Sequence, residues 1–236
     1  TITRTNPING NYTIKVGTNE AVSTDTESFA DKTITLSASP NPGYHFVEWT
    51  VTKNSGGTIT VTDNTFTMPA EDVTVAATFA ATTYNITYHL NGGEGAANST
   101  YTVESAAITL PIPTKTGYAF GGWFDNEKCT GTAITTIAAG STEDKTFYAK
   151  WTANRYTVTL DQTDATTPGV TSIEVTYDTE MPSIAGQLPK RTGYYFGGYF
   201  TEENGDGTQY YNQEGTAFYN KTWDIKTSDY NNEESV

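Results

Sequence analysis

One pattern occurs three times along the chain, with its opening tyrosines 72 residues apart. The copies open at Tyr12, Tyr84 and Tyr156 and close at Phe79, Trp151 and Trp223. Inside each copy a Gly-Tyr pair precedes another large ring: Gly43-Tyr44 with Trp49, Gly117-Tyr118 with Trp123, and Gly193-Tyr194 with Tyr199. Self-similarity at a fixed period indicates consecutive copies of one structural unit. We therefore expect three small modules in a row and no active site that spans them.

The repeat also predicts where the modules begin and end. We expect modules at 1–80, 84–151 and 156–223, followed by a polar, acidic tail at 224–236. The two linkers hold four residues each and no glycine, which predicts neighbouring modules held close together with limited swing. The chain starts and stops in mid-pattern without an initiating Met, so we expect it to be a piece of a longer protein.

Composition and periodicity favour β-structure. Only 17% of the residues are charged, whereas the chain holds 16 Tyr and 21 Gly and is rich in Thr. β-Branched and aromatic side chains suit a pleated, half-buried surface. Segments such as 12–16, 84–90 and 146–151 alternate apolar and polar residues, as strands with one buried face do. Because only 28–32 and 134–139 could form a helical turn, we predict a mainly β fold (α+β with little helix).

The charge and the apolar pattern exclude several classes of partner. A net charge of −14 argues against binding nucleic acid, which needs clustered Lys and Arg to neutralise phosphates. The same charge argues against docking on anionic lipid. No apolar run reaches the roughly 18 residues that a membrane span requires, so we expect no membrane insertion by this segment. The simplest interpretation of the acidity is solubility.

The residues that usually carry catalysis are scarce. Cys129 is the single cysteine and lies in a polar, turn-like stretch, while His45 and His89 lie in different modules. A reactive thiol needs a basic partner, so we expect none here, and the role of Cys129 stays open. The acidic segment 202–207 has oxygen ligands and glycines, but it lacks the ligand spacing of a calcium loop and is better interpreted as a solvated hairpin turn. We predict no enzyme, no metal site and no cofactor.

The ring-and-glycine string resembles a known family. Residues 113–124, followed by Phe-Tyr-Ala-Lys-Trp at 147–151, resemble the Listeria–Bacteroides repeat, also called the internalin B-repeat. Residues 193–200 resemble it again, although Tyr199 stands where the pattern has Trp and the copy has a longer ending. Residues 43–49, with downstream segments at 66–69 and 72–75, resemble the divergent form of the repeat. The resemblance covers nearly the whole chain.

This resemblance implies a fold and a setting. The family consists of small β-grasp-like modules, found in arrays on bacterial surface and secreted proteins in adhesion and spacing contexts, and it has no known catalytic residues. The fold expected is therefore three tandem small β-grasp-like modules in an elongated array. The location expected is the cell envelope or the extracellular space of a bacterium.

The signature residues are interpreted as a folding device. Gly117 is expected to supply a positive φ at the turn that enters a strand. Gly121 and Gly122 are expected either to form a bulge that turns Trp123 back toward the core or to allow a close backbone approach. The residues assigned this structural role are Gly43, Tyr44, Phe46, Trp49, Gly117, Tyr118, Phe120, Trp123, Trp151, Gly193, Tyr194, Phe196, Tyr199 and Trp223.

Two functions remain open from the sequence. The first is a non-catalytic repeat segment that serves as a stalk and as an adhesion and protein-interaction array, whose open β-edges pair with a partner strand. The alternative is a carbohydrate-binding array that uses exposed aromatic residues, with Tyr210, Tyr211 and Tyr219 as the speculative ligand-facing rings. Adjacent strand residues face opposite sides, so one of Tyr210 and Tyr211 is expected to point outward. The partner expected is a protein or a glycan on a host or neighbouring cell surface.

Overall fold

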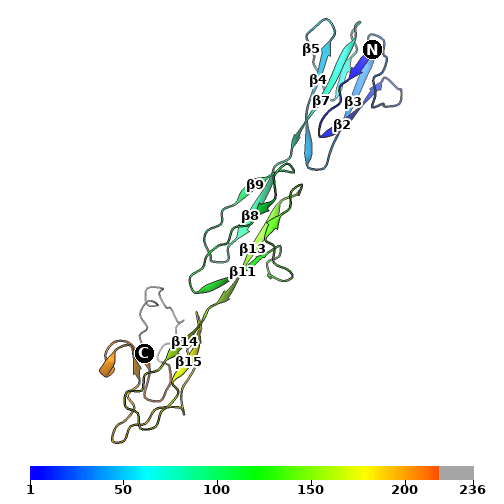
Figure 1. Ribbon diagram of the computed structural model, residues 1–236. Coiled ribbons are helices and arrows are strands. Elements are labelled where there is room, and N and C mark those ends of the chain that lie inside the picture. The colour runs from blue at the N-terminus through cyan, green and yellow to red at the C-terminus, as the bar shows by residue number, and fades with distance from the viewer. Residues whose placement is uncertain (218–236) are drawn as a thin grey trace. The chain divides into compact units, whose positions relative to one another are not determined.

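The structure is a computed structural model that describes residues 1–217 (Figure 1). This part of the chain holds seventeen strands and a single 3-10 helix, η1 (Glu203–Gly205), so the mainly β prediction is confirmed. No helix among these residues is long and apolar enough to cross a membrane. The β-grasp assignment and the elongated arrangement stay predictions.

The chain divides into two compact units, which we describe one at a time. The first contains Thr1–Tyr88, Ala97–Leu110 and Ile134–Phe147, and the second contains His89–Ala96, Pro111–Ala133 and Tyr148–Val236, of which 218–236 lie outside the described residues. Both units include part of the second repeat. The module boundaries expected from the sequence therefore stay a prediction.

The first repeat forms two sheets within the first unit. One sheet has the strand order β1 (Ile2–Arg4), β7 (Val73–Ala81), β4 (Tyr44–Lys53) and β5 (Thr58–Ile59). The other has the order β2 (Gly10–Val16), β3 (Thr33–Pro40) and β6 (Thr65–Thr67). Only β1 and β7 pair in parallel; the other described pairs in these sheets are antiparallel.

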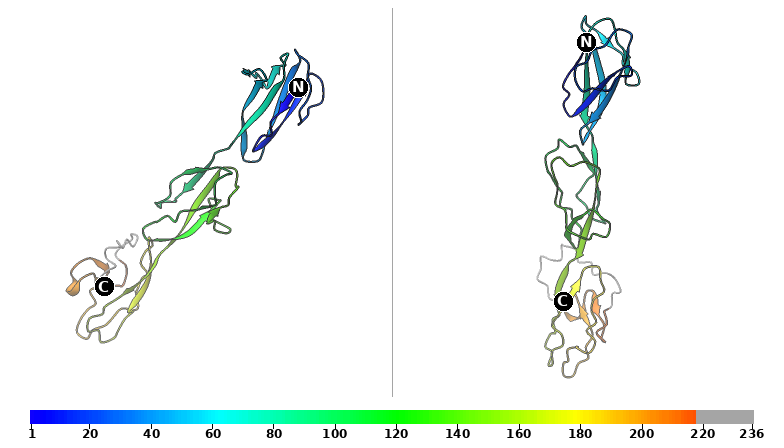
Figure 2. Two further views of the ribbon diagram at one scale, coloured as in Figure 1. Left: turned by 45° about the horizontal axis from the view of Figure 1, so that its top comes forward. Right: turned by 90° about the vertical axis from the view of Figure 1, so that its right-hand side faces the viewer.

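The core of the first repeat is built from residues of both sheets, whose strands Figure 2 shows from two further sides. Alternate residues of each strand point inward, which is the strand period of two seen in the sequence. The buried cluster consists of Ile2, Tyr12, Ile14, Ile34, Leu36, Val51, Phe66, Met68, Val73, Val75, Ala77 and Phe79. Each fully buried aliphatic side chain stabilises the fold by about 1.5–3 kcal/mol relative to exposure. Tyr12 is satisfied inside this core because its hydroxyl donates to the carbonyl of Val75 at 2.6 Å.

Two further strand pairs belong to the first unit. Strand β8 (Tyr84–His89) pairs with β9 (Ser99–Tyr101), and β10 (Ile108–Thr109) pairs with β12 (Thr136–Ile137), both antiparallel. Tyr101 is buried, and its hydroxyl donates to the carbonyls of Thr142 and Glu143 at 3.0 and 2.5 Å. These hydrogen bonds from Tyr101 hold the loop that precedes β13 (Lys145–Ala153) against β9.

In the second unit, β11 (Tyr118–Phe124) pairs antiparallel with the end of β13. The register shifts between Phe120 and Trp123, and Gly122 takes a φ of +108°. The register shift marks a bulge at this place, and Trp123 beyond it is 1% exposed. Strand β4 of the first unit shifts register at the equivalent place, between Phe46 and Glu48.

The described part of the third repeat has two short sheets. Strand β14 (Arg155–Thr159) pairs with β15 (Ser172–Thr176), and β16 (Tyr199–Phe200) pairs with β17 (Gln209–Tyr211). Its core consists of Val158, Leu160, Ile173, Val175, Met181, Ile184, Tyr199 and Tyr211. The predicted closing strand of this repeat, with Trp223, lies outside the described residues.

Candidate functional site

The signature rings of the second repeat pack against one another. Phe120 lies 5.5 Å from Trp123 and 5.4 Å from Trp151, measured between ring centroids. The indole nitrogen of Trp123 donates to the carbonyl of Pro111 at 2.7 Å, and that of Trp151 donates to Leu90 at 2.8 Å. These indoles hold loop carbonyls in place, and their hydrogen-bonding groups are not available to a ligand.

The other two repeats have comparable ring clusters. In the first, the ring of Phe46 lies 4.7 Å from Trp49 and 6.0 Å from Phe79. In the third, Phe196 lies 5.2 Å from Tyr199, which takes the place of the tryptophan. Tyr199 is 4% exposed, and its hydroxyl has no hydrogen-bond partner among the described residues. Burial raises the pKa of Tyr199 to about 12.

The Gly-Tyr pair of the first repeat contacts the second repeat within the first unit. Gly43 has a φ of +85°, and the amide of Tyr44 donates to the carbonyl of Asn41 at 3.0 Å, which closes a tight turn. A methyl group on Gly43 would lie 2.6 Å from Cβ of Val103, so this side chain covers the glycine. The hydroxyl of Tyr44 donates to Oε1 of Glu104 at 3.1 Å.

The same contact recurs within the second unit. Gly117 has a φ of +78°, as the sequence predicted, and a methyl group on it would lie 2.3 Å from the ring of Tyr177. The hydroxyl of Tyr118 donates to Oδ2 of Asp178 at 2.9 Å. This hydrogen bond is the main cause that raises the pKa of Tyr118 above its ordinary value, because the neutral phenol is the donor.

The third Gly-Tyr pair has the same backbone conformation as the other two, but its surroundings differ. Gly193 has a φ of +83°, and the amide of Tyr194 donates to the carbonyl of Arg191 at 3.1 Å. No atom of residues 1–217 lies within 4 Å of a methyl group placed on Gly193. The side chain of Tyr194 is 67% exposed, and its neighbour Tyr195 is fully exposed. This turn therefore has the backbone conformation of the other two, but no side chain of residues 1–217 covers its glycine.

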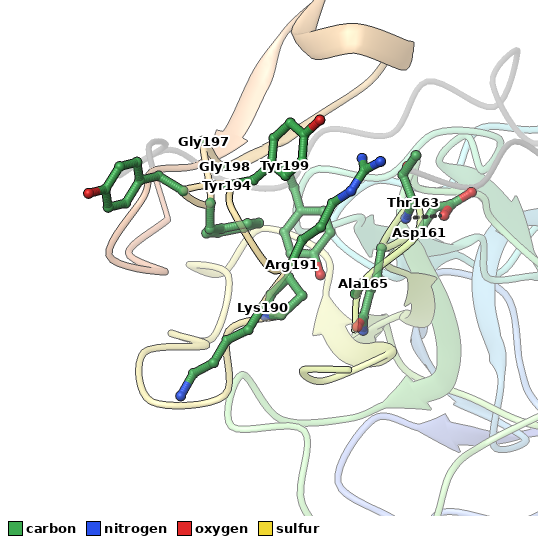
Figure 3. A pocket seen from close by; sticks show the side chains of 13 residues that line it. Asp161, Thr163, Ala165, Lys190, Arg191, Tyr194, Gly197, Gly198 and Tyr199 are labelled. Carbon is green, nitrogen blue, oxygen red and sulfur yellow. Dashed lines mark hydrogen bonds between the residues drawn. The ribbon is translucent and has the colours of Figure 1, made fainter. Parts of the chain in front are cut away.

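A shallow hollow of about 230 Å³ lies beside this turn (Figure 3). Lys190 and Arg191 lie on one side of it, and Asp161 and Thr163 lie on the other (Figure 3). The guanidinium of Arg191 lies 4.4 Å from the ring centre of Tyr194 and 3.6 Å from the carboxylate of Asp164. The hollow offers cations and exposed rings, and it brings no pair of carboxylates together for acid–base chemistry.

The structure corrects one speculative ligand-facing residue. Tyr211 is 0% exposed, and its hydroxyl donates to the carbonyl of Pro182 at 2.7 Å, so its ring fills the core and cannot face a ligand. Burial also raises its pKa to about 12. Tyr210 is half-buried, and Tyr219 lies outside the described residues. A ligand contact by Tyr210 stays a prediction.

The acidic hairpin and the cysteine offer little chemistry. The segment from Glu202 to Gly207 forms η1 and a turn. Nowhere in residues 1–217 do three or more His, Cys, Asp or Glu side chains gather closely enough to hold a metal ion. Cys129 is half-buried, and its sulfur lies 3.8 Å from the carbonyl oxygen of Ala149. Its role stays open.

Sequence reasoning missed the residues that cover the glycine turns: Val103 and Glu104, and Tyr177 and Asp178. A usable signal was present, because both pairs stand in a Thr–apolar–acid–Ser/Thr string, at 102–105 and 176–179. The string follows β9 in one case and β15 in the other. Its acidic residue follows each signature tyrosine by 60 residues.

Comparison with known proteins places these repeats in a family. The family model described as the Listeria–Bacteroides repeat domain matches residues 84–150 and 156–224. The model described as the divergent InlB B-repeat domain matches residues 11–83. The first of these matches alone spans more than half of the chain.

Three relatives share parts of the sequence. A protein of Evansella cellulosilytica named as a Gly-rich membrane protein is 28% identical over 189 residues, which is 78% of this chain and 19% of the relative. A second protein of the same organism, named as a membrane protein, is 32% identical over 143 residues, or 60% and 21% of the two chains. Internalin H of Listeria monocytogenes is 33% identical over 146 residues, or 60% and 23%. The chain thus spans about a fifth of the length of these relatives.

Proposed function

This chain belongs to the Listeria–Bacteroides repeat family, and from that premise we propose that it is a non-catalytic repeat segment of a bacterial cell-surface or secreted protein. It serves as a stalk and as an adhesion and protein-interaction array. The names of the two Evansella relatives, both membrane proteins, support a place in the cell envelope. The similarity to Internalin H supports a repeat protein of the internalin kind.

The observation that carries the stalk proposal is the recurring contact at the Gly-Tyr turns. Tyr44 bonds to Glu104 inside the first unit, and Tyr118 bonds to Asp178 inside the second. Each bond joins a residue of one repeat to a residue of the next. Together with linkers of four residues, these contacts restrict the swing of successive repeats, which is what a spacer requires.

The non-catalytic part of the proposal rests on the nature of the interior. Among residues 1–217 no charged side chain is buried, and the buried titratable groups are tyrosines of the core that burial keeps neutral, whereas catalytic groups commonly sit in sites that tune their charge for chemistry. The hollow beside Tyr194 is shallow, and the charged groups around it are exposed. The family as matched adds no catalytic motif to this chain.

Small-angle X-ray scattering tests the stalk. A compact chain of this length has a radius of gyration of roughly 18 Å, so an extended array must give a clearly larger value. The double variant Tyr44→Ala and Tyr118→Ala should broaden the distance distribution, because both contacts between successive repeats are lost. Tyr195→Ala, a change at an exposed ring, is the matched control and should leave the scattering unchanged. A radius near 18 Å for the unaltered chain would overturn the stalk proposal.

The carbohydrate-binding alternative retains one structural support. Tyr195 is fully exposed and lies beside the hollow with Lys190 and Arg191, and an exposed ring next to polar side chains can stack on a sugar. A glycan array probed with the chain and with Tyr195→Ala decides it. Binding that is lost in the variant supports this function, and equal binding by the two proteins removes Tyr195 from it. Phe29→Ala, which removes another exposed ring, is the control for non-specific binding through an exposed aromatic side chain.

A further inference from the structure

We infer that the turn at Gly193 and Tyr194 is a docking site for a further repeat of this family. The repeat it accepts presents an apolar residue and then a carboxylate in the turn after its second strand. The inference rests on the proposed function of the chain as a repeat array. It goes beyond that function by naming the surface, the occupant and the chemistry of their contact.

The two occupied turns define what docking looks like. In both, an apolar side chain covers the glycine so closely that a methyl group there would clash: Val103 over Gly43, and Tyr177 over Gly117. In both, the tyrosine hydroxyl donates to the carboxylate of the next residue, 60 positions after the tyrosine. An apolar cover and a phenol-to-carboxylate hydrogen bond are therefore the shared elements of the contact.

The third turn is built to the same plan. Its glycine has a φ of +83°, against +85° and +78° in the occupied turns, and its tyrosine amide closes the turn in the same way at 3.1 Å. The guanidinium of Arg191 braces the ring of Tyr194 at 4.4 Å, as the ammonium of Lys115 braces Tyr118 at 4.4 Å. The tyrosine is thus held in position before any repeat docks on it, which lowers the entropy lost on docking.

What distinguishes the third turn is its exposure. Tyr44 and Tyr118 are half-buried, whereas Tyr194 is 67% exposed. The glycine beside it is also exposed, and no atom of residues 1–217 covers it. A preformed turn whose glycine is left uncovered by residues 1–217 has the conformation of the two occupied turns and, in this part of the chain, no occupant.

The strand register indicates which residues an occupant must carry. The opening tyrosines of the three repeats pair with Ala38, Tyr101 and Val175. Three residues further on stand Asn41, Glu104 and Asp178, so the second and third repeats supply carboxylates and the first does not. A second copy of this chain is therefore a poor occupant, since its two carboxylates are already bonded to Tyr44 and Tyr118. A further repeat of the second or third kind has the carboxylate free.

Insertion of one more repeat tests the inference in the full chain. A copy of residues 80–151, which carries its own Val103 and Glu104, is placed between Trp223 and Asp224. Hydroxyl-radical footprinting read by mass spectrometry then reports the reactivity of Tyr194, with Tyr44 as the occupied reference and Tyr195 as the exposed one. We expect the reactivity of Tyr194 to fall to the level of Tyr44, while Tyr195 stays reactive.

A variant insertion and a second insertion make the result specific. Val103→Ala with Glu104→Ala in the inserted copy should return Tyr194 to its reactivity in the parent chain. The second insertion uses a copy of residues 152–223 with Tyr194→Phe in that copy, so that only the original Tyr194 is read. It offers Tyr177 and Asp178 in place of Val103 and Glu104 and should protect Tyr194 equally.

The opposing outcomes separate the two proposals. Unchanged reactivity of Tyr194 with both insertions overturns the docking site. So does a Tyr194 that is already as protected as Tyr44 in the parent chain, because residues 218–236 of the chain itself would then cover it. If Tyr44 and Tyr118 react as fast as Tyr195 in the parent chain, the contacts between successive repeats are absent in solution and the stalk proposal fails as well.

Discussion

Tyr118 donates its phenolic hydrogen bond to Asp178 at 2.9 Å, across 60 residues of sequence. Beneath this bond the ring of Tyr177 rests on Gly117 and meets the ring of Tyr118 edge-on at 5.4 Å between centroids. The bond fixes the direction of the tyrosine, and the glycine makes room for the covering ring. Both parts of this contact can be altered separately.

Alanine at the glycine turns should distinguish a covered turn from an uncovered one. Gly117 and Gly193 both have a positive φ, so Gly117→Ala and Gly193→Ala share a strain cost of about 1–2 kcal/mol. Gly117→Ala must also displace the ring of Tyr177, which adds about 1–3 kcal/mol to its cost. The new methyl group of Gly193→Ala contacts no atom of residues 1–217, so this variant has no such added cost. Urea unfolding followed by circular dichroism measures both. Equal losses of stability would contradict the close cover of Gly117.

The two buried tyrosines of the third repeat should make the fold sensitive to alkali. Burial raises the pKa of both Tyr199 and Tyr211 to about 12, above the value near 10 expected when unfolded. The stabilising effect of keeping each phenol neutral is complete below pH 10 and is lost as the pH rises through 12, because the unfolded chain releases its protons first. Urea midpoints measured from pH 8 to 11.5 should therefore fall steeply above pH 10.

Phenylalanine variants separate these two tyrosines at neutral pH. Tyr211→Phe leaves the carbonyl of Pro182 without its donor and should cost about 1 kcal/mol. Tyr199→Phe removes a buried hydroxyl that has no partner among the described residues, so its stability at pH 7 should be equal or higher. Both variants should flatten the fall above pH 10. A Tyr199→Phe protein that is clearly less stable at pH 7 would mean that its hydroxyl is bonded.

Trp123 should matter more to stability than the equivalent Trp49. Trp123 is 1% exposed and donates to the carbonyl of Pro111, so Trp123→Phe leaves a small cavity and an unpaired carbonyl and should cost about 2–3 kcal/mol. Trp49 is half-buried and donates to the exposed side chain of Asn64, so Trp49→Phe should cost about 1 kcal/mol. Thermal unfolding of the two variants, compared with the parent, measures the difference. A larger loss for Trp49→Phe would reverse this ranking.

Alanine scanning for glycan contacts should give different results at Tyr195 and Tyr211. Tyr211→Ala empties part of the core and should cost about 3–5 kcal/mol, so any loss of binding in it reports unfolding. Tyr195→Ala changes an exposed ring and should leave stability within about 0.5 kcal/mol. Only the second variant can therefore report a ligand contact. Thermal unfolding measured beside the glycan array checks this assignment.

Much of the local structure could be predicted because its causes are local. The alternation in 12–16 predicts β2, and the glycine before Tyr118 predicts a positive φ. The Gly-Gly pair before Trp123 predicts a bulge, since an extra residue is needed to return the ring to the buried face. Each of these inferences uses residues a few positions apart.

The partners of the turns were missed because they lie far along the chain, and only the shared string at 102–105 and 176–179 marks them. Nothing near Gly117 indicates that Tyr177 covers it, and the acidic residue after each covering side chain looks like an ordinary surface charge in sequence. The prediction that Tyr211 faces a ligand was wrong for a related reason. Alternation along a strand indicates that one of Tyr210 and Tyr211 points inward, but it does not indicate which one. Only the register of β16 against β17 places Tyr211 inside.

The first repeat ends its second strand at Pro40 and continues with Asn41 and Pro42, where the other repeats have an acid. The contact at each turn is consequently heterologous: a phenol on one repeat meets a carboxylate on its successor, and no surface meets a copy of itself. Such head-to-tail pairing gives a chain of repeats a polarity and sets no upper limit on its length. A divergent repeat without the acid offers no carboxylate to a tyrosine turn that comes before it.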